Sequence, residues 1–173
     1  MGESEKNYKR IVIKIGSSII CPESCNHDSK TLSGILAQIA KLTSEGKEVI
    51  IVSSGAIAFG MNLMKLTSRP KELSLLQAVA SVGQNVLMDT YSKVFAQFKV
   101  TCGQVLLTWD DFNDRRRYLN AKNTLLKLLE LGVVPVINEN DTVSTDEIRF
   151  GDNDRLSALV ATLVNADMLV ILS

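Results

Sequence analysis

Five short apolar runs rich in valine and isoleucine are spaced along the chain, with polar segments between them. They occupy residues 11–15, 48–52, 103–107, 133–137 and 168–172. The runs are mostly continuous rather than alternating with polar residues, which is typical of strands covered on both faces, as in parallel sheets. The pattern therefore predicts five strands inside a layered fold.

Segments with helical periodicity separate these runs. Residues 29–46 repeat apolar side chains at helical spacing and end in glycine, which favours a helix stop. The apolar face of this helix consists of Leu32, Ile35, Leu36 and Ile39. Residues 72–98 are long enough for two helices or for one helix with a kink near Gly83. Residues 115–132 and 152–166 are also predicted to be helical.

The regular alternation of strands and helices defines the fold class. It favours an α/β fold, a three-layer α/β/α sandwich around a mainly parallel sheet. No internal repeat or linker interrupts the alternation, so we interpret residues 1–173 as one domain. The last predicted strand runs up to Ser173, whereas functional loops in open α/β sheets follow the carboxyl ends of strands. We therefore expect the domain to be incomplete at its C-terminal end.

The composition argues against two classes of partner. The 173 residues include 19 basic and 19 acidic side chains, and this balance gives no sign of a nucleic-acid or membrane-surface partner. No apolar run approaches the ~20 residues of a spanning helix. The first ten residues are polar and lack the apolar core of a signal peptide. We expect a cytoplasmic protein.

The cysteines are few and odd in number. Cys21 and Cys25 lie close to the only histidine, His27, and Cys102 stands apart. Such a count fits reduced thiols better than a disulfide framework. The spacing of the cluster matches no common zinc pattern, and a fourth ligand is missing. We interpret the cluster as a polar loop and predict no metal site, with metal binding kept as the alternative.

A lysine interrupts the first apolar run. Lys14 lies among isoleucines and is followed by the turn Gly16, Ser17 and Ser18. A buried amine needs a partner, and a lysine beside a Gly-Ser turn at a strand end suits a phosphate group. A lysine reaching solvent from an edge strand explains the same residues equally well. The chain contains neither a Walker A loop nor a G-x-G-x-x-G fingerprint.

A second candidate site follows the second predicted strand. In VSSGAIAFG, Ser54 is placed to cap a helix and Gly55 to keep the turn open. The free N–H groups of a helix N-terminus attract anions such as phosphate or carboxylate. Plain capping of an ordinary α/β turn is the alternative, and these residues alone favour it.

A third candidate is an acidic stretch near the C-terminal end. Six acids lie within residues 139–154, namely Glu139, Asp141, Asp146, Glu147, Asp152 and Asp154. Such a cluster repels itself unless a cation is present, and Mg²⁺, a substrate ammonium group or lysine are the candidates. A solvated acidic loop is the alternative. Asp154 is placed to organise lysines, and Asn153 and Asp141 to hold the ammonium and carboxylate of an amino acid.

A fourth charged segment, residues 108–125, mixes three arginines with three aspartates. The arginines are Arg115, Arg116 and Arg117, and the aspartates are Asp110, Asp111 and Asp114. Local charge pairing on a solvated face is the favoured interpretation. A subunit or effector contact is the alternative.

Six motifs resemble the amino acid kinase family and occur in the order found in that family. They are IVIKIGSS, VSSGAIAFG, LLQAVASVGQ, DDFNDRRRYLNAKNTL, PVINENDTVST and FGDNDRLSALVA, and they cover nearly the whole chain from Lys9 onward. Single motifs of this kind are weak, but six in order are specific. PVINEND and GDNDRLSA resemble most the branch of the family that acts on glutamate.

The resemblance implies an enzyme that uses ATP with Mg²⁺ to phosphorylate the side-chain carboxylate of L-glutamate. The product would be L-glutamyl 5-phosphate, the first intermediate of proline biosynthesis. Each site residue is carried over by its motif: the catalytic positions are Lys14 and Asp154, the glutamate-binding positions are Ser54, Gly55, Asp141 and Asn153, and the nucleotide-binding positions are Lys14, Gly16, Ser17 and Ser173. The family also suggests dimers or tetramers and proline as a feedback inhibitor.

The chain departs from the family pattern by stopping at Ser173. Family members continue with a nucleotide-binding half that carries a Gly-rich segment and a second catalytic lysine. We therefore expect residues 1–173 to be the amino-acid-binding lobe. Two alternatives stay open: a relative that phosphorylates aspartate, acetylglutamate or carbamate, and a non-catalytic amino-acid-binding module. The acid-rich stretch favours a substrate with a free ammonium group.

Overall fold

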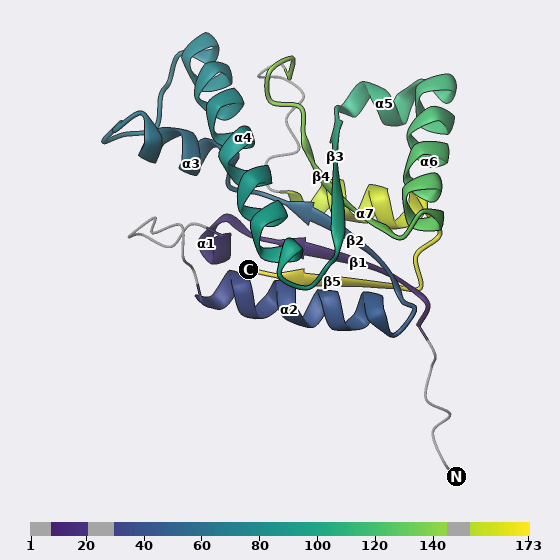
Figure 1. Cartoon of the computed structure of the whole chain (residues 1–173). Coiled ribbons are helices and arrows are strands. Elements are labelled where there is room, and N and C mark those ends of the chain that lie inside the picture. Colours follow the sequence, from purple (N-terminus) through teal and green to yellow (C-terminus); the bar gives the residue numbers. More distant parts are fainter. Residues whose placement is uncertain (1–7, 21–29, 145–152) are drawn as a thin grey trace.

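The computed structural model describes residues 8–20, 30–144 and 153–173, and its elements alternate as the sequence predicts (Figure 1). The strands are β1 (Arg10–Ile15), β2 (Glu48–Ser53), β3 (Thr101–Leu107), β4 (Val133–Glu139) and β5 (Met168–Leu172). The helices are α1 (Ser17–Ile20), α2 (Lys30–Ser44), α3 (Ala56–Leu63), α4 (Leu73–Ala96), α5 (Trp109–Asn113), α6 (Arg115–Glu130) and α7 (Asn153–Leu163). All five predicted strands are confirmed, with ends that shift by at most two residues.

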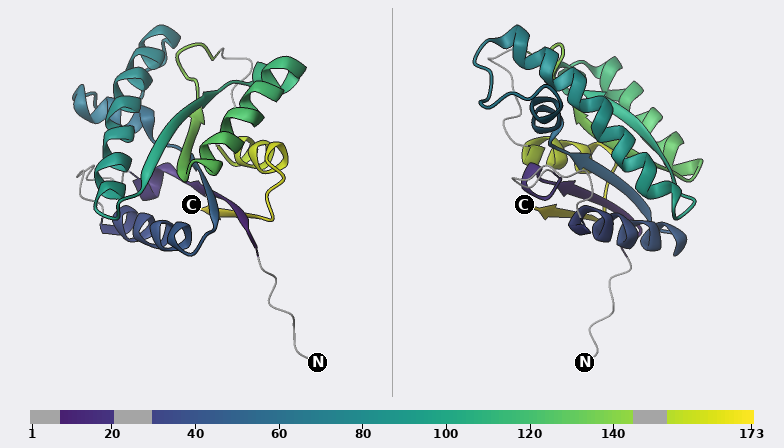
Figure 2. Two further views of the ribbon diagram at one scale, coloured as in Figure 1. Left: turned by 45° about the vertical axis from the view of Figure 1, so that its right-hand side comes forward. Right: turned by 60° about the vertical axis from the view of Figure 1, so that its left-hand side comes forward.

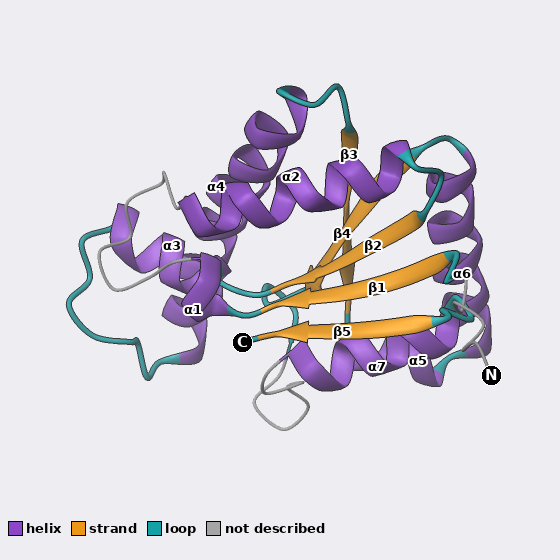
Figure 3. Ribbon diagram, turned by 90° about the horizontal axis from the view of Figure 1, so that it is seen from below, coloured by secondary structure: helices purple, strands orange, loops and turns teal. Residues whose placement is uncertain are grey.

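The strands form one parallel sheet in the order β3-β4-β2-β1-β5. In Figure 3 the arrowheads of β1, β2 and β5 point the same way, toward α1 and α3. Strand β1 is interior, because Lys14 is in register with Val52 of β2 on one side and with Ile171 of β5 on the other. The carboxyl ends of β1, β2 and β5 therefore meet at one edge of the sheet.

Helices cover both faces of the sheet, so the predicted α/β/α sandwich is confirmed (Figure 2). One core packs α2 and α4 against the sheet, and Tyr91 and Phe95 of α4 are fully buried there. The other core packs α6 and α7 against the opposite face, through residues such as Leu125 and Val160. Neighbouring residues of a strand point to opposite faces. Lys14 therefore shares the α7 side of the sheet with Val12.

The edge strands differ from the inner strands in burial. Strands β1, β2 and β4 are buried over almost their whole length, as continuous apolar runs predict. Strands β3 and β5 are only partly covered, and Ile171 of β5 is 47% exposed. The physical reason is position, since an edge strand has a sheet neighbour on one side alone.

Residues 73–96 form one uninterrupted helix, α4, which settles the alternative between one helix and two. Gly83 within it serves close packing against α3. A Cβ at Gly83 would lie 1.7 Å from the carbonyl oxygen of Ala56, and a Cβ at Gly60 would lie 1.9 Å from that of Val79. Helices α3 and α4 therefore cross with their backbones in contact, because neither crossing position has a side chain.

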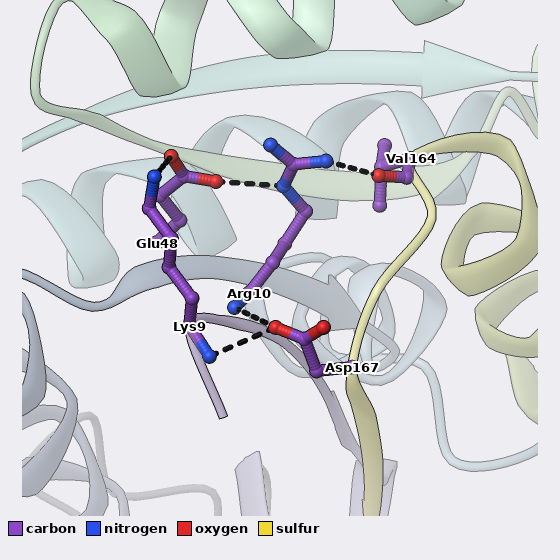
Figure 4. Close-up of polar contacts among 5 residues, drawn as sticks. All are labelled: Lys9, Arg10, Glu48, Val164 and Asp167. Atoms are coloured by element: carbon purple, nitrogen blue, oxygen red, sulfur yellow. Dashed lines mark hydrogen bonds and ion pairs between the residues drawn. The ribbon is translucent and has the colours of Figure 1, made fainter. Parts of the chain in front are cut away.

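A compact polar cluster closes the amino end of the sheet (Figure 4). The Nε of Arg10 donates to Oε2 of Glu48 at 2.7 Å, and its Nη1 donates to the carbonyl of Val164. Oδ2 of Asp167 accepts from the backbone N–H groups of Lys9 and Arg10, at 2.8 and 2.7 Å. These two hydrogen bonds hold the pKa of Asp167 below its usual value. We name Lys9, Arg10, Glu48 and Asp167 the amino-end cluster.

Within the described residues, each helix is either too short or too polar to span a bilayer.

Candidate active site

A cavity of about 500 Å³ opens at the carboxyl edge of the sheet. Its wall is built by the segments that follow β1, β2 and β4, by the start of α7 and by the end of β5. The polar lining consists of Lys14, Gly16, Ser17, Ser18, Ser54, Gly55, Arg69, Asn138, Glu139, Asp141, Asn153 and Ser173. This is the edge at which open α/β sheets bind ligands. Every predicted binding residue lines this cavity, and Asp154 reaches it through its contact with Lys14.

Lys14 is a buried cation in the cavity wall. Its side chain leaves the inner strand β1 and is only 6% exposed, so the alternative of a lysine reaching solvent from an edge strand is wrong. Its Nζ lies 2.6 Å from Oδ1 of Asp154, in the first turn of α7. The start of a helix favours a carboxylate, and the Asp154 side chain is 42% exposed. The ion pair holds the amine of Lys14 at the border of the cavity.

The turn after β1 is tightly packed against the end of β5. The N–H of Gly16 donates to the carbonyl oxygen of Leu172 at 2.8 Å. A Cβ at Gly16 would lie 3.2 Å from that oxygen and 3.6 Å from Nζ of Lys14. The N–H of Gly16 is occupied, and Ser17 and Ser18 are the donors of this turn that line the cavity.

The second turn departs from the prediction in one detail. Gly55, not Ser54, is the N-cap of α3, and no side chain caps this helix. Gly55 has φ +96°, a conformation that glycine adopts readily, and a Cβ there would press on Cγ2 of Ile20 at 3.2 Å. The N–H of Ser54 donates to the carbonyl of Ile15 at 3.1 Å. Ser54 thus joins the ends of β1 and β2, and it lines the cavity without capping α3.

Three buried side-chain amides form a continuous chain that runs from the cavity wall to α4. Nδ2 of Asn153 donates to the carbonyl of Ser53 and, at 2.8 Å, to Oδ1 of Asn138. The same Oδ1 accepts from the backbone N–H of Glu139 at 2.9 Å. Nδ2 of Asn138 donates to Oε1 of Gln84 at 2.8 Å. We name Gln84, Asn138 and Asn153 the amide chain.

The acidic stretch is described only in part. Glu139 is buried and accepts a hydrogen bond from Oγ of Ser144 at 2.6 Å, and Asp141 lines the cavity. Asp146, Glu147 and Asp152 lie outside the described residues, so the predicted gathering of six acids stays a prediction. The cluster of Cys21, Cys25 and His27 also lies outside them. In residues 8–20, 30–144 and 153–173, no group of three or more histidine, cysteine, aspartate or glutamate side chains is placed to hold a metal ion.

The structure adds two residues that the sequence analysis did not select. Arg69, in the loop between α3 and α4, is an exposed cation on the cavity wall, and it forms no ion pair with any described residue. Gln84 lies in the middle of α4 and joins the amide chain. Residue type alone selects neither, because Gln84 reaches the site through the approach of α4 to β4 and Arg69 through the path of the loop between α3 and α4.

The arginine- and aspartate-rich segment forms local pairs away from the cavity. Nη2 of Arg117 lies 2.7 Å from Oδ1 of Asp111, and Asp114 caps α6 by accepting from the N–H of Arg117. Thr108 and Asp111 form a capping box at the start of α5. Burial alone would raise the pKa of Asp111, but hydrogen bonds from Thr108 and Arg117 lower it overall. Local charge pairing is confirmed for Arg117 with Asp111, while the subunit or effector contact stays a prediction.

Comparison with known proteins agrees with the motifs. The Amino acid kinase family matches residues 9–173. A protein named glutamate 5-kinase from Azoarcus sp. (strain BH72) is 51% identical over 173 residues, which are 100% of this chain and 47% of that protein. Proteins of the same name from Cupriavidus metallidurans and Thioalkalivibrio sulfidiphilus are 55% and 53% identical over 165 residues, which are 95% of this chain and 44% of each relative.

These similarities run along almost the whole chain. The chain spans less than half the length of the curated relatives it matches. A parallel α/β/α sandwich, a cavity at the carboxyl edge of its sheet and a family match over residues 9–173 agree with one another. The chain belongs to the amino acid kinase family.

Proposed function

We propose that this chain is part of an enzyme that transfers the γ-phosphoryl group of ATP to the side-chain carboxylate of L-glutamate. The product is L-glutamyl 5-phosphate, which opens proline biosynthesis. The observation that carries the proposal is the position of Lys14, a buried cation held by Asp154 in the wall of the cavity. The relatives named glutamate 5-kinase, at 51–55% identity, support the same substrate.

The proposed reaction brings two anions together. A γ-carboxylate oxygen of glutamate attacks the γ-phosphorus of ATP, the bond from that phosphorus to the bridging oxygen breaks, and ADP leaves. The carboxylate is ionised at neutral pH, so the step needs no general base. Positioning and charge stabilisation are then the protein's main contributions. Lys14 neutralises charge on the group in transfer, and Asp154 keeps its amine in place.

The nucleotide side of the proposed site is formed by the turn after β1 and the end of β5. Ser17 and Ser173 line the cavity next to Lys14 and supply polar contacts to phosphate. When bound, Mg²⁺ would supply positive charge to the nucleotide phosphates. The described residues offer no group of three ligands for it. We therefore assign Mg²⁺ no ligand among the described residues, and the role of Lys14 stands without it.

The glutamate side of the proposed site matches a zwitterion in charge. Asp141 and the oxygen of Asn153 face the ammonium group, because both can accept its hydrogens. Arg69 is the cation on the same wall that forms no ion pair among the described residues, and it faces the α-carboxylate. Ser54 and Gly55 at the start of α3 lie between these groups and complete the glutamate contacts.

A substrate panel tests this proposal. The intact natural protein is incubated with ATP and each acid, and hydroxylamine traps the acyl phosphate. We expect L-glutamate to be the best substrate. Glutarate lacks the ammonium group and 4-aminobutyrate lacks the α-carboxylate, so each should lose at least about tenfold in kcat/KM, which corresponds to one lost charged contact.

Other outcomes of the panel identify the alternatives. Preferred turnover of aspartate, acetylglutamate or carbamate would show another acceptor and overturn the glutamate assignment. Glutamate binding in a calorimeter without any hydroxamate would show a non-catalytic binding module. Because the reaction consumes ATP, we infer that it takes place in the cytoplasm. Dimers or tetramers and feedback by proline stay predictions from the family, which sedimentation and inhibition assays can test.

A further inference from the structure

We infer that Gln84, which lies behind the cavity in α4, is a positioning residue that acts on Asn153 through Asn138. The consequence is that Asn153 offers a ligand only a hydrogen-bond acceptor. The geometry of the amide chain stands without any assumption about the reaction. The identity of the ligand group as the ammonium of glutamate rests on the proposed function.

The orientation of Asn138 is fixed by a backbone donor. The N–H of Glu139 can only donate, so the atom of Asn138 that lies 2.9 Å from it is the oxygen Oδ1. The nitrogen Nδ2 must then point the other way, toward Gln84. The atom of Gln84 at 2.8 Å from this nitrogen therefore accepts and is Oε1.

The orientation of Asn153 is fixed by a backbone acceptor. The carbonyl oxygen of Ser53 can only accept, so the atom of Asn153 that contacts it is Nδ2. The second hydrogen of this nitrogen goes to Oδ1 of Asn138, at 2.8 Å. Both donors of the Asn153 amide are thereby used inside the protein. Its remaining polar atom is Oδ1, which accepts hydrogen bonds from a ligand's N–H or O–H groups.

Gln84 fixes the orientation of the Asn138 side-chain amide. Asn138 is 3% exposed, so its Nδ2 needs a partner inside the protein, and Oε1 of Gln84 supplies it. A flipped Asn138 would turn its NH₂ group toward the N–H of Glu139 and the NH₂ of Asn153, which sets donors against donors. Nε2 of Gln84 is itself buried without a hydrogen-bond partner among the described residues. The side chain therefore contributes to the site through its oxygen.

The test replaces Gln84 by methionine in the intact natural protein. Methionine keeps most of the volume and removes the acceptor. We expect KM for glutamate to rise about tenfold, kcat to change less than about threefold and KM for ATP to stay constant, because the weakened contact to the ammonium is equally strong in the ground state and in the transition state. The preference for glutamate over glutarate should shrink by a similar factor, since glutarate has no ammonium group.

A matched control separates positioning from stability. Tyr91 also lies in α4, is fully buried and shares a 3.0 Å hydrogen bond with Oγ of Ser53. Tyr91→Phe removes this bond and leaves the amide chain intact. We expect it to lower the unfolding midpoint about as much as Gln84→Met, with KM for glutamate unchanged. An equal rise of KM in both variants would overturn the inference, because it would show a general loss of packing.

A measurement on the wild-type protein needs neither a foldable variant nor an active enzyme. With ¹⁵N labelling, both side-chain amide hydrogens of Asn153 should be protected from solvent exchange without ligand. Fast exchange of either hydrogen would overturn the inference. An unchanged KM in Gln84→Met, with glutamate still phosphorylated, would also overturn it. A wild-type protein that fails to phosphorylate glutamate while both hydrogens are protected would instead contradict the proposed function and support the amide chain.

Discussion

The two ends of strand β1 carry the same kind of ion pair in opposite surroundings. At the amino end, Arg10 pairs with Glu48, both side chains are 24% exposed, and one further hydrogen bond goes to the carbonyl of Val164 (Figure 4). At the carboxyl end, Lys14 is buried, pairs with Asp154 and borders the cavity. Arg10 uses its donors in contacts that hold the fold together, whereas the amine of Lys14 lies next to the cavity. The comparison shows that the surroundings of an ion pair, more than its presence, indicate whether it belongs to a functional site.

The largest expected effect comes from removing the cation at the cavity. Lys14→Met keeps most of the side-chain stem, so packing on the α7 side of β1 is retained. We expect turnover of glutamate to fall by about 10²–10³-fold, the usual effect of losing one electrostatic group at the site of charge transfer. Asp154 is partly exposed and can be hydrated, so the unfolding midpoint should change little. Steady-state kinetics and thermal unfolding measure the two effects separately.

Near-normal turnover in Lys14→Met would contradict a catalytic role for Lys14. A large loss of stability with proportionate loss of activity would show that Lys14, like Arg10, is structural.

The intermediate effect comes from the matching cation at the amino end. Arg10→Met removes a 2.7 Å bond to Glu48 and a bond to the carbonyl of Val164. Because this variant loses hydrogen bonds made by a charged group, we expect it to be less stable by about 1–2 kcal/mol. Urea unfolding can measure the difference. The cavity lies at the other end of the strand, so turnover should stay within about twofold of wild type. A loss of turnover as large as that of Lys14→Met would erase the difference between the two ends.

The smallest effect is a pH dependence at the amino end. The backbone N–H groups of Lys9 and Arg10 lower the pKa of Asp167 in the folded protein below its ordinary value of 3.8. A carboxyl group whose pKa is lowered by folding stabilises the protein fully at pH values above its pKa in the unfolded state. This stabilisation is lost as the pH falls through its pKa in the folded state. The stability difference between wild type and Asp167→Asn should therefore be constant above about pH 5 and shrink below about pH 4.

Unfolding by urea at several pH values measures this difference. A difference that grows toward acid pH would contradict the lowered pKa of Asp167.

Much of the fold was predictable because its signals are local. Five apolar runs identified five strands, since inner parallel strands must be apolar on both faces. Lys14 was noticeable for the same reason, because a charge within such a run needs a partner. The sequence could not decide whether β1 is an edge strand, because strand order depends on pairings distant in sequence. That order, once known, excluded the alternative in which Lys14 reaches solvent from a sheet edge.

The parts of the site that were missed depend on tertiary geometry. Gln84 resembles any other helical glutamine until α4 is packed against β4 and its oxygen meets Asn138. Arg69 lies in a loop whose path follows from the crossing of α3 and α4. Ser54 was predicted as a cap from its residue type, but the positive φ of Gly55 moves the start of α3 one residue further. Residue type indicates what a side chain can do, whereas backbone conformation determines what it does.

The glycine crossing of α3 and α4 sets the spacing of two elements that bear on the cavity. At Gly60 and Gly83 the main chains of the two helices approach each other closely. Their separation is thus set by backbone dimensions that every sequence shares, as long as both positions remain glycine. The same contact sets the distance between the start of α3 and Gln84, the neighbour of Gly83. Gly60 and Gly83 thereby set the spacing of the side chains that α3 and α4 present to the site.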